Sequence, residues 1–345
     1  MGIVKANAYG HGLVETAGIL VGEGIDYLGV GFLQEGIMLR RSGIRTPVLV
    51  LGGVLGDQIQ AFLENDLEIT VSSIELARRI ENEVSISGAR KARVHLKIDT
   101  GMERIGVRAE NALPFAQEVA QLPHLEILGI YSHLATSDES DKSFASKQVR
   151  KFNEVARTLE SHAIGIPLKH IANSGAILDM PDSYFNLARP GIMLYGLYPS
   201  RDTSESIPLH PVLSLRSKVV FIKEVAAHTS ISYGRTYYTQ CATRIATIPI
   251  GYGDGYSRML SGRAHVLIRG ERYPVVGTIC MDQMMVDIGT QAEIHVGDDV
   301  TLIGKDGRES ISAWDLAEQT GTNHYEVLCM IAARVPRVCV ECPLG

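Results

Sequence analysis

The sequence predicts an α/β fold, a (β/α)8 TIM barrel, followed by a second and mostly β C-terminal domain. Two observations support this prediction. Up to about residue 200, short β-rich runs alternate with amphipathic helical stretches, the pattern of βα units around a parallel sheet. After about Pro211, helical stretches become rare and strands follow one another across glycine-rich turns. We therefore expect a barrel domain at residues 1–208 and a β-rich domain at residues 209–345.

A barrel of this kind needs eight strands, and eight runs rich in β-branched and aliphatic residues are present. Between them lie stretches such as SIELARRIENEV and KQVRKFNEVARTLESH, in which apolar residues recur three and four positions apart, so helices with one buried face are expected. The alternation favours a closed barrel over an open sheet. The predicted strands are Ile3–Ala6, Asp26–Gly31, Pro47–Leu51, Leu67–Val71, Ala92–Asp99, Leu125–Tyr131, Leu168–Ala172 and Tyr184–Leu187.

The second domain is predicted from four apolar, β-branched runs, LSLRSKVVFIKEV, TRIATIPIG, AHVLIRG and DDVTLIG. Only SAWDLAEQ and YEVLCMIA indicate short helices in this part of the chain. The segment SRDTSESIPLHP is polar and bounded by prolines, which is typical of a linker.

Composition limits the classes of partner. The chain has 345 residues, 45% of them hydrophobic, and a formal net charge of −6 without long runs of one sign. This balance gives no sign of binding to nucleic acid or anionic lipid, so a small-molecule partner is expected. No apolar run reaches the roughly 18 residues of a membrane helix, and the N-terminus lacks a secretory signal pattern, so we expect a cytoplasmic protein.

The five cysteines are an odd number in a chain too large to depend on disulfides, so a disulfide framework is not expected. Cys339 and Cys342 form a lone C-x-x-C. Without a second pair, or a histidine at ligand spacing, two reduced thiols are favoured over a zinc site. No metal is predicted.

Polar residues gather at the carboxyl ends of the predicted barrel strands, the face on which barrel enzymes hold their active sites. Any one of them alone is most simply a surface or loop residue. Their convergence on one rim predicts an active site. They are Lys5 after the first strand, Lys97 and Asp99 late in the fifth, His133 after the sixth, Asn173 and Ser174 after the seventh, and Arg189 just past the eighth.

A lysine at a barrel mouth can bind an anion, pair with a carboxylate or form a Schiff base with a carbonyl. The last role needs a cofactor pocket. Tyr9 and Ser174 offer hydroxyls, and ARPGIMLYG offers backbone N–H groups around Gly191 and Ile192, together a plausible phosphate cradle. The combination predicts pyridoxal 5'-phosphate as cofactor.

A longer set of motifs runs in order through both predicted domains. GYGDGY alone would say little, because it lacks the G-x-G-x-x-G spacing after a strand. Taken together, the motifs resemble those of the alanine racemase family, and the resemblance covers nearly the whole chain. The motifs are VKANAYGHG, KIDTGMERIGVR, YSHLAT, HIANSGA, NLARPGIMLYG, SYGRTY, PIGYGDGY and GTICMDQMMVDIG.

The resemblance implies a pyridoxal-phosphate-dependent isomerase that interconverts L- and D-alanine with two bases. Lys5 would carry the cofactor and act as one base, and Tyr233 of the partner subunit in a homodimer would act as the other. Arg189 would contact the pyridine nitrogen, with His133 linking Arg189 to that tyrosine. An arginine leaves the ring nitrogen an acceptor, which weakens the electron sink and disfavours side reactions.

The resemblance also assigns residues to substrate and cofactor. Arg104 would contact the cofactor phenolate and the substrate carboxylate, and the Met281 N–H would bind that carboxylate. Tyr252 would help form the entrance, with Asp282 counted among the substrate-binding residues. The cofactor-binding set is Lys5, Tyr9, His133, Asn173, Ser174, Arg189, Gly191 and Ile192, and Lys97 matches a lysine that is carbamylated in some members.

Two features depart from the family pattern. Only four residues precede Lys5, where members have some thirty, so we expect either an N-terminally truncated chain or a wrongly placed start of the sequence. Ala333, in CMIAARVPR, stands where the family usually has a tyrosine that reaches the cofactor phosphate. Losing that hydrogen bond changes binding by about 1–3 kcal/mol. It also leaves space beside the substrate methyl, which suggests some relaxation toward serine.

Several hypotheses about the function therefore remain open. The first is an alanine racemase supplying D-alanine for peptidoglycan, with a broader amino-acid (serine) racemase as a variant. A decarboxylase of similar architecture would place an acidic residue where this chain has Arg189. A cofactor-binding protein without turnover would not need SYGRTY and CMDQ, which serve substrate. The last reading is a truncated, inactive homologue that binds pyridoxal phosphate.

Overall fold

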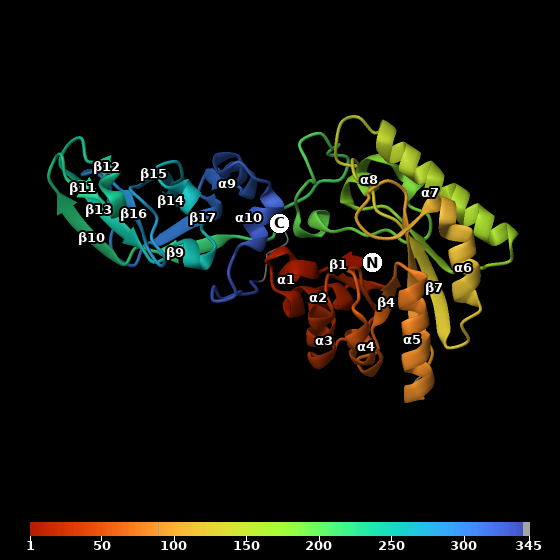
Figure 1. Cartoon of the computed structure of the whole chain (residues 1–345). Coiled ribbons are helices and arrows are strands. Elements are labelled where there is room, and N and C mark those ends of the chain that lie inside the picture. The colour runs from red at the N-terminus through yellow and green to blue at the C-terminus, as the bar shows by residue number, and fades with distance from the viewer. Residues whose placement is uncertain (89, 341–345) are drawn as a thin grey trace. The chain divides into compact units, whose positions relative to one another are not determined.

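The computed structural model describes residues 1–88 and 90–340, and it divides into two compact units (Figure 1). The first unit comprises Met1–Ala8 and Gly12–His210, and the second comprises Tyr9–His11 and the chain from Pro211 onward. The three residues Tyr9–His11 thus group with the C-terminal unit, although they lie near the start of the chain.

The first unit is built on a parallel sheet, as predicted. Its strands follow one another around the sheet in the order β1-β2-β3-β4-β5-β7-β8, with β6 added beside β5. Strand β5 is buried along almost its whole length, which is typical of parallel strands covered on both faces. The strands are β1 (Gly2–Ile3), β2 (Leu28–Val30), β3 (Val48–Val50), β4 (Glu68–Val71), β5 (Ala92–Asp99), β6 (Val107–Arg108), β7 (Leu125–Tyr131) and β8 (Leu168–His170).

The eighth predicted strand, Tyr184–Leu187, is wrong. Phe185 has a φ of +47°, which a strand does not allow, so this aromatic run forms a turn despite its β propensity. The next segment, Ala188–Pro190, takes the strand's place: the Arg189 N–H donates to the Ala172 carbonyl (2.9 Å) and the Ile3 N–H donates to the Pro190 carbonyl (3.0 Å). The ring of backbone hydrogen bonds is therefore closed by an irregular segment that we call the seam.

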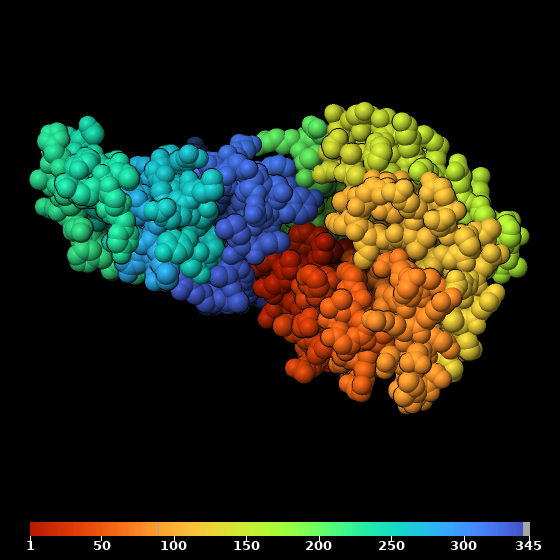
Figure 2. Space-filling model, in the orientation of Figure 1, coloured from red at the N-terminus to blue at the C-terminus, as the bar shows by residue number. Residues whose placement is uncertain are grey.

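Helices surround this sheet, with α5, α6 and α7 along its outer side (Figure 1), and their side chains form the surface of the unit on the side seen in Figure 2. Helix α5 begins at its cap Ser73, whose hydroxyl accepts the Leu76 N–H, and ends at Gly88 with φ +63°. The helices are α2 (Leu13–Gly22), α3 (Leu33–Arg41), α4 (Ile59–Glu64), α5 (Ile74–Ser87), α6 (Ala112–Ala120), α7 (Ser143–Ser161) and α8 (Ser174–Asp179), with short 3-10 turns at Gly56–Gln58, Ala109–Asn111, Pro181–Ser183 and Ile192–Tyr195.

The second unit is a mostly antiparallel sheet, again as predicted. Its order is β10-β13-β16-β15-β14-β17-β18, with β9 beside β17, and β11 and β12 form a separate hairpin. The strands are β9 (Leu215–Lys218), β10 (Phe221–Val225), β11 (Ser230–Ile231), β12 (Tyr237–Tyr238), β13 (Thr243–Ile248), β14 (His265–Ile268), β15 (Glu271–Val276), β16 (Met284–Asp287), β17 (Asp299–Asp306) and β18 (Glu309–Ile311).

Two short helices complete this unit, α9 (Ala313–Thr320) and α10 (His324–Cys329), with 3-10 turns at Tyr233–Arg235, Tyr252–Asp254 and Arg258–Leu260. The core comes from inward residues of β13, β14, β16 and β17, among them Ile248, Val266, Val286 and Val300, all essentially inaccessible to solvent. None of the helices in the described part of the chain combines the length and the apolarity needed to cross a membrane.

Candidate active site

Lys5 stands where β1 ends and the backbone turns left-handed. Ala6, Asn7, Ala8 and Tyr9 all have φ between +52° and +54°, so the segment labelled α1 (Lys5–Tyr9) is a left-handed turn. This also shortens the predicted strand Ile3–Ala6 to Gly2–Ile3. L-amino acids lose roughly 1–2 kcal/mol per residue in this conformation. Such strain persists only where the surroundings fix it, and it is concentrated at functional sites.

Arg189, in the seam, has a guanidinium that is only 4% exposed. Its Nη2 donates to the carbonyls of Ser132 (2.7 Å) and Ile171 (3.2 Å), and Nη1 lies 2.8 Å from His170 Nδ1. Nη2 also lies 3.5 Å from His133 Nδ1. Burial lowers the pKa of Arg189 to about 10. Its Nε–H has no partner among the described residues, so this fixed guanidinium has a donor left for an acceptor outside the chain.

A buried chain of hydrogen bonds continues from Arg189 into the barrel. His170 Nε2 lies 3.1 Å from His95 Nδ1, and His95 Nε2 lies 2.9 Å from Glu68 Oε2. Arginine only donates, so His170 Nδ1 must accept, which puts the His170 proton on Nε2 and the His95 proton on Nε2. Burial and the Arg189 charge hold the pKa of His170 well below its usual value, which keeps His170 neutral. The chain therefore runs from Arg189 to the Glu68 carboxylate with every proton assigned.

A second cation, Lys97, is buried late in β5. Its Nζ lies 4.4 Å from the ring centre of Tyr131, and the same ring stacks on His170 at 4.8 Å. Burial, then the charges of Arg189 and Arg104, hold the pKa of Lys97 well below its usual value. These terms favour a neutral amine at Lys97, and neutral amines are the form that reacts with electrophiles.

His133 follows β7 and faces the same guanidinium. Burial, then the charges of Arg189, Lys97, Arg104 and Lys5, hold its pKa well below the usual value, so the imidazole is neutral. Because arginine only donates, His133 Nδ1 is the acceptor and its proton lies on Nε2. Arg104 itself lies exposed in the loop after β5.

Ser174 and Gly191 are brought together, as a phosphate cradle requires. Ser174 Oγ accepts the N–H groups of Gly191 (2.9 Å) and Met193 (3.4 Å), and its own proton is left to donate elsewhere. Asn173 caps α8: its Oδ1 accepts the Ala176 N–H and the Ser137 hydroxyl. Ile192 begins the 3-10 turn that follows Gly191. Tyr9, the remaining predicted phosphate contact, groups with the second unit, where its ring lies 6.1 Å from that of Tyr325 and burial raises its pKa.

In the second unit, Tyr233 lies at the tip between β11 and β12. Its side chain is 73% exposed, while its backbone carbonyl accepts the Thr278 hydroxyl at 2.9 Å. The backbone of the tip is therefore anchored and the phenol projects into solvent. Such an arrangement offers a side chain to a partner molecule rather than to the core of its own unit.

Met281 and Tyr252 lie on two loops of this unit that are tied together. The N–H groups of Tyr252 and Gly253 donate to the carbonyls of Cys280 (3.1 Å) and Met281 (2.8 Å). A Cβ at Gly251 would come within 2.2 Å of the Cys280 carbonyl oxygen, which explains a glycine of GYGDGY by close approach. Arg334 fastens the assembly through Asp254 and Asp282, each at 2.7 Å.

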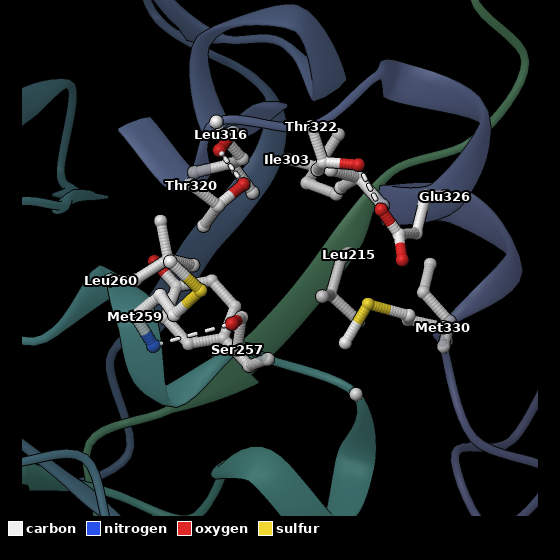
Figure 3. Close-up of a pocket in the computed structure, with 15 residues that line it drawn as sticks. Leu215, Ser257, Met259, Leu260, Ile303, Leu316, Thr320, Thr322, Glu326 and Met330 are labelled. Atoms are coloured by element: carbon white, nitrogen blue, oxygen red, sulfur yellow. Dashed lines mark hydrogen bonds between the residues drawn. The ribbon is translucent and has the colours of Figure 1, made fainter. Parts of the chain in front are cut away.

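The pocket drawn in Figure 3 also belongs to this unit, with a volume of about 330 Å³. Leu215, Leu260, Ile303 and Met330 give it an apolar wall, and Thr322 and Glu326 lie on one side of it. None of the described residues predicted for the active site lines this pocket. The chemistry is therefore sought at the barrel rim and at the loops described above.

Sequence reasoning missed the inner part of the site: Glu68, His95, His170 and Tyr131. A signal was present, because Glu68 and His95 lie beside aliphatic residues in buried strands, and buried charged residues are rare unless paired. Among the described residues, no group of three or more histidine, cysteine or acidic side chains is placed to hold a metal ion. Cys342 of the C-x-x-C lies outside the described residues.

Family models match both parts of the chain. The N-terminal domain of alanine racemase matches residues 1–199, and the C-terminal domain of alanine racemase matches residues 212–339. A curated alanine racemase from Methanococcus maripaludis is 45% identical over 340 residues, covering 98% of this chain and 91% of the relative.

Solved structures of similar fold also belong to racemases. An alanine racemase from Clostridium difficile 630 has a TM-score of 0.92 and 43% identity, covering 97% of this chain and 87% of that one. A histidine racemase from Leuconostoc mesenteroides has a TM-score of 0.91 and 30% identity, covering 99% of this chain and 91% of that one. The fold is thus shared with racemases of more than one amino acid.

Proposed function

Because the chain belongs to the alanine racemase family, we propose that it interconverts L- and D-alanine with Lys5 and Tyr233 as its two bases. The observation that carries the proposal is the buried Arg189, fixed by two carbonyls and the neutral His170, with Nε–H left for an acceptor at the carboxyl ends of the strands. This is the environment that an electron-rich ring nitrogen needs.

We propose pyridoxal 5'-phosphate as the group that supplies this acceptor. Lys5 would hold it covalently, Arg189 would face its ring nitrogen, and Ser174 with the backbone around Gly191 and Ile192 would face its phosphate. When bound, this cofactor delocalises the charge that develops on the substrate Cα. Arg104 and Arg189 make the site cationic, which suits a phosphate and a substrate carboxylate.

Racemisation needs a proton taken from one face of Cα and another delivered to the opposite face. Lys5 Nζ would act on one face and the Tyr233 phenol on the other. The phenol is 73% exposed in its own unit, which supports a homodimer in which each subunit supplies Tyr233 to the other. His133, neutral with its proton on Nε2, would link the incoming phenol to Arg189.

The remaining residues would serve the substrate. Arg104 and the Met281 N–H would bind its carboxylate, and Tyr252 with Asp282 would form the entrance, on loops that Arg334 holds together. We propose that Lys97 is carbamylated: its lowered pKa favours the neutral amine that adds to carbon dioxide. The carbamate would turn a buried cation into an anion able to orient Arg104.

The substrate range and cellular role also belong to this proposal. A relative at 30% identity is a histidine racemase, so the shared fold does not fix the amino acid, and serine is the second candidate because Ala333 replaces a larger residue. We propose a cytoplasmic enzyme that supplies D-alanine for peptidoglycan.

The test is conversion of L-alanine to D-alanine by the purified chain with added pyridoxal phosphate, beside a Lys5→Ala variant. Turnover that disappears in the variant supports the proposal. If neither protein turns over but the wild type still binds the cofactor, the chain is an inactive homologue. If serine is converted faster than alanine, the chain is a serine racemase.

A further inference from the structure

The left-handed turn after Lys5 needs something to hold it, because three of its residues, Ala6, Asn7 and Ala8, are L-amino acids with φ near +54° and lie in the first unit. Backbone bonds hold both ends of this segment: the Ala8 N–H donates to the Val4 carbonyl (2.8 Å) and the Gly12 N–H donates to the Asn7 carbonyl (3.0 Å). Ala6 and Asn7 are exposed, so burial does not fix them. A further restraint, on the Ala6 and Asn7 N–H groups, comes from elsewhere in the unit.

That restraint is the Glu35 carboxylate on α3. Its Oε1 accepts the N–H groups of Ala6 (2.6 Å) and Asn7 (3.4 Å), and its Oε2 accepts those of Gly31 (2.8 Å) and Phe32 (3.3 Å). One charged side chain thus joins the end of β1 to the end of β2. Hydrogen bonds to a carboxylate are stronger than those between neutral groups.

Helix capping explains only half of these contacts. A glutamate in the first turn of a helix often accepts the N–H of the residue that precedes the helix, as Glu35 does with Phe32. The bonds to Ala6 and Asn7 cross to another strand and contribute nothing to the start of α3. They act on the backbone that carries Lys5.

The same carboxylate borders the path of the Lys5 side chain. A Cβ at Gly31 would lie 3.3 Å from Glu35 Oε2, 3.5 Å from Lys5 Cβ and 3.9 Å from Lys5 Cδ. The lysine stem therefore passes beside a residue whose N–H is bound by Glu35. Displacing the carboxylate would loosen both the turn and one side of this path.

We propose that Glu35 is a positioning residue, which fixes the left-handed turn and with it the place of the Lys5 amine. Its consequence for catalysis rests on the proposed function, whereas its effect on the turn does not. Misplacing a reacting group by about 1 Å can cost on the order of 100-fold in rate. That is the size of effect expected when this carboxylate is lost.

The test is Glu35→Gln, which keeps the size of the side chain but places an amide NH2 against one pair of N–H donors. We expect faster hydrogen exchange at the Ala6 and Asn7 amides and a kcat about 100-fold lower. The matched control is Glu75→Gln, since Glu75 lies in the first turn of α5 and hydrogen-bonds only near its own cap Ser73. This control is expected to retain wild-type exchange at the turn and wild-type kcat.

A second substitution tests whether a lower kcat in Glu35→Gln comes from the loss of the restraint on the turn or from a general loss of structure. Glycine adopts positive φ without strain. We therefore expect the double variant Glu35→Gln, Ala6→Gly to have a kcat at least about tenfold higher than Glu35→Gln alone. Ala6→Gly in the wild type should change kcat little. Unchanged exchange in Glu35→Gln, or the absence of rescue, overturns the proposal.

If Glu35→Gln does not fold, the wild type still decides: an Ala6 amide that exchanges as fast as an unstructured one overturns it. If the wild type is not a racemase at all, the hydrogen-exchange rates at Ala6 and Asn7 still test whether Glu35 fixes the turn.

Discussion

The two units present their polar residues in opposite ways. In the barrel, Arg189 and His170 are buried, and their hydrogen bonds lead to the buried carboxylate of Glu68. In the C-terminal unit, Tyr233 and Met281 are 73% and 54% exposed, and only their backbones are fixed. The barrel is thus organised in advance, and the second unit leaves these two side chains accessible.

The difference separates two demands on an active site. A group that must keep one proton state over many turnovers is best buried with its partners, because burial strengthens both the bonds and the penalty for breaking them. A group that must meet a second molecule needs to stay accessible. We therefore expect barrel substitutions to change stability as well as rate, and loop substitutions to change rate alone.

The largest expected effect is on the accessible side. Replacing Tyr233 by Phe removes one proposed base and should slow racemisation on the order of 10³-fold, because a positioned acid or base typically contributes about 10²–10⁴. The free energy of unfolding should change by less than about 0.5 kcal/mol, as for other surface positions. Steady-state rates in both directions and urea unfolding measure the two quantities. A slowing of less than about tenfold would place the second base elsewhere.

The next effect is on the buried side. In Glu68→Gln, His95 keeps a hydrogen-bond acceptor but the chain loses its charge, so unfolding should become easier by about 1.5–3 kcal/mol. The exposed Glu64→Gln on α4 is the matched control and should change stability by less than about 0.5 kcal/mol. Urea unfolding followed by circular dichroism measures both. Equal stability of the two variants would mean that the buried chain is dispensable.

A smaller effect concerns pH. The pKa of His170 is lowered in the folded state, so below pH about 6.5 the unfolded chain binds a proton that the folded chain does not. Stability should therefore fall as the pH falls from about 6.5 toward the lower folded pKa, by at most about 1.4 kcal/mol per pH unit from this residue. In His170→Gln this part of the slope should vanish. An unchanged slope would show that His170 is charged in the fold.

The smallest effect is expected at Ala333, which is exposed but lies next to an arginine held by two ion pairs. Ala333 is exposed, and its neighbour Arg334 pairs with Asp254 and Asp282 beside Tyr252 and Met281. If its small size relaxes specificity, Ala333→Tyr should lower the serine-to-alanine rate ratio by less than about tenfold, because at this exposed position we expect the low end of the about 1–3 kcal/mol that one small group carries in a pocket. Competition between the two substrates measures this ratio. A ratio that does not fall removes Ala333 as the cause.

The fold could be predicted where patterns are long. Strands β5 and β7 have the predicted bounds, because each is an unbroken run with clear breakers, and the amphipathic stretches became α5 and α7. The last strand failed because Tyr184–Leu187 has the right composition but Phe185 turns left-handed, which no propensity reveals. The ring of backbone hydrogen bonds is instead completed by Ala188–Pro190, a segment that contains a proline.

The residues of the candidate site could likewise be predicted only in part. Residues at strand ends, such as Lys5 and Arg189, could be picked out because position along a barrel strand predicts the rim. Glu35 could not, since its role depends on contacts between segments distant in sequence. A glutamate in a helical pattern looks like a cap or a solvated side chain until the backbone it binds is known.

The seam has a consequence for the order in which the molecule is made. A ribosome releases Lys5 well before Ala188–Pro190, yet β1 has its second backbone neighbour only after that segment has emerged, and the Tyr195 hydroxyl then binds the Ile3 carbonyl at 2.9 Å. Contacts so distant in sequence form late. We expect nascent chains that stop before the seam to expose β1 to proteases, so that Lys5 and Arg189 meet only when the barrel is complete.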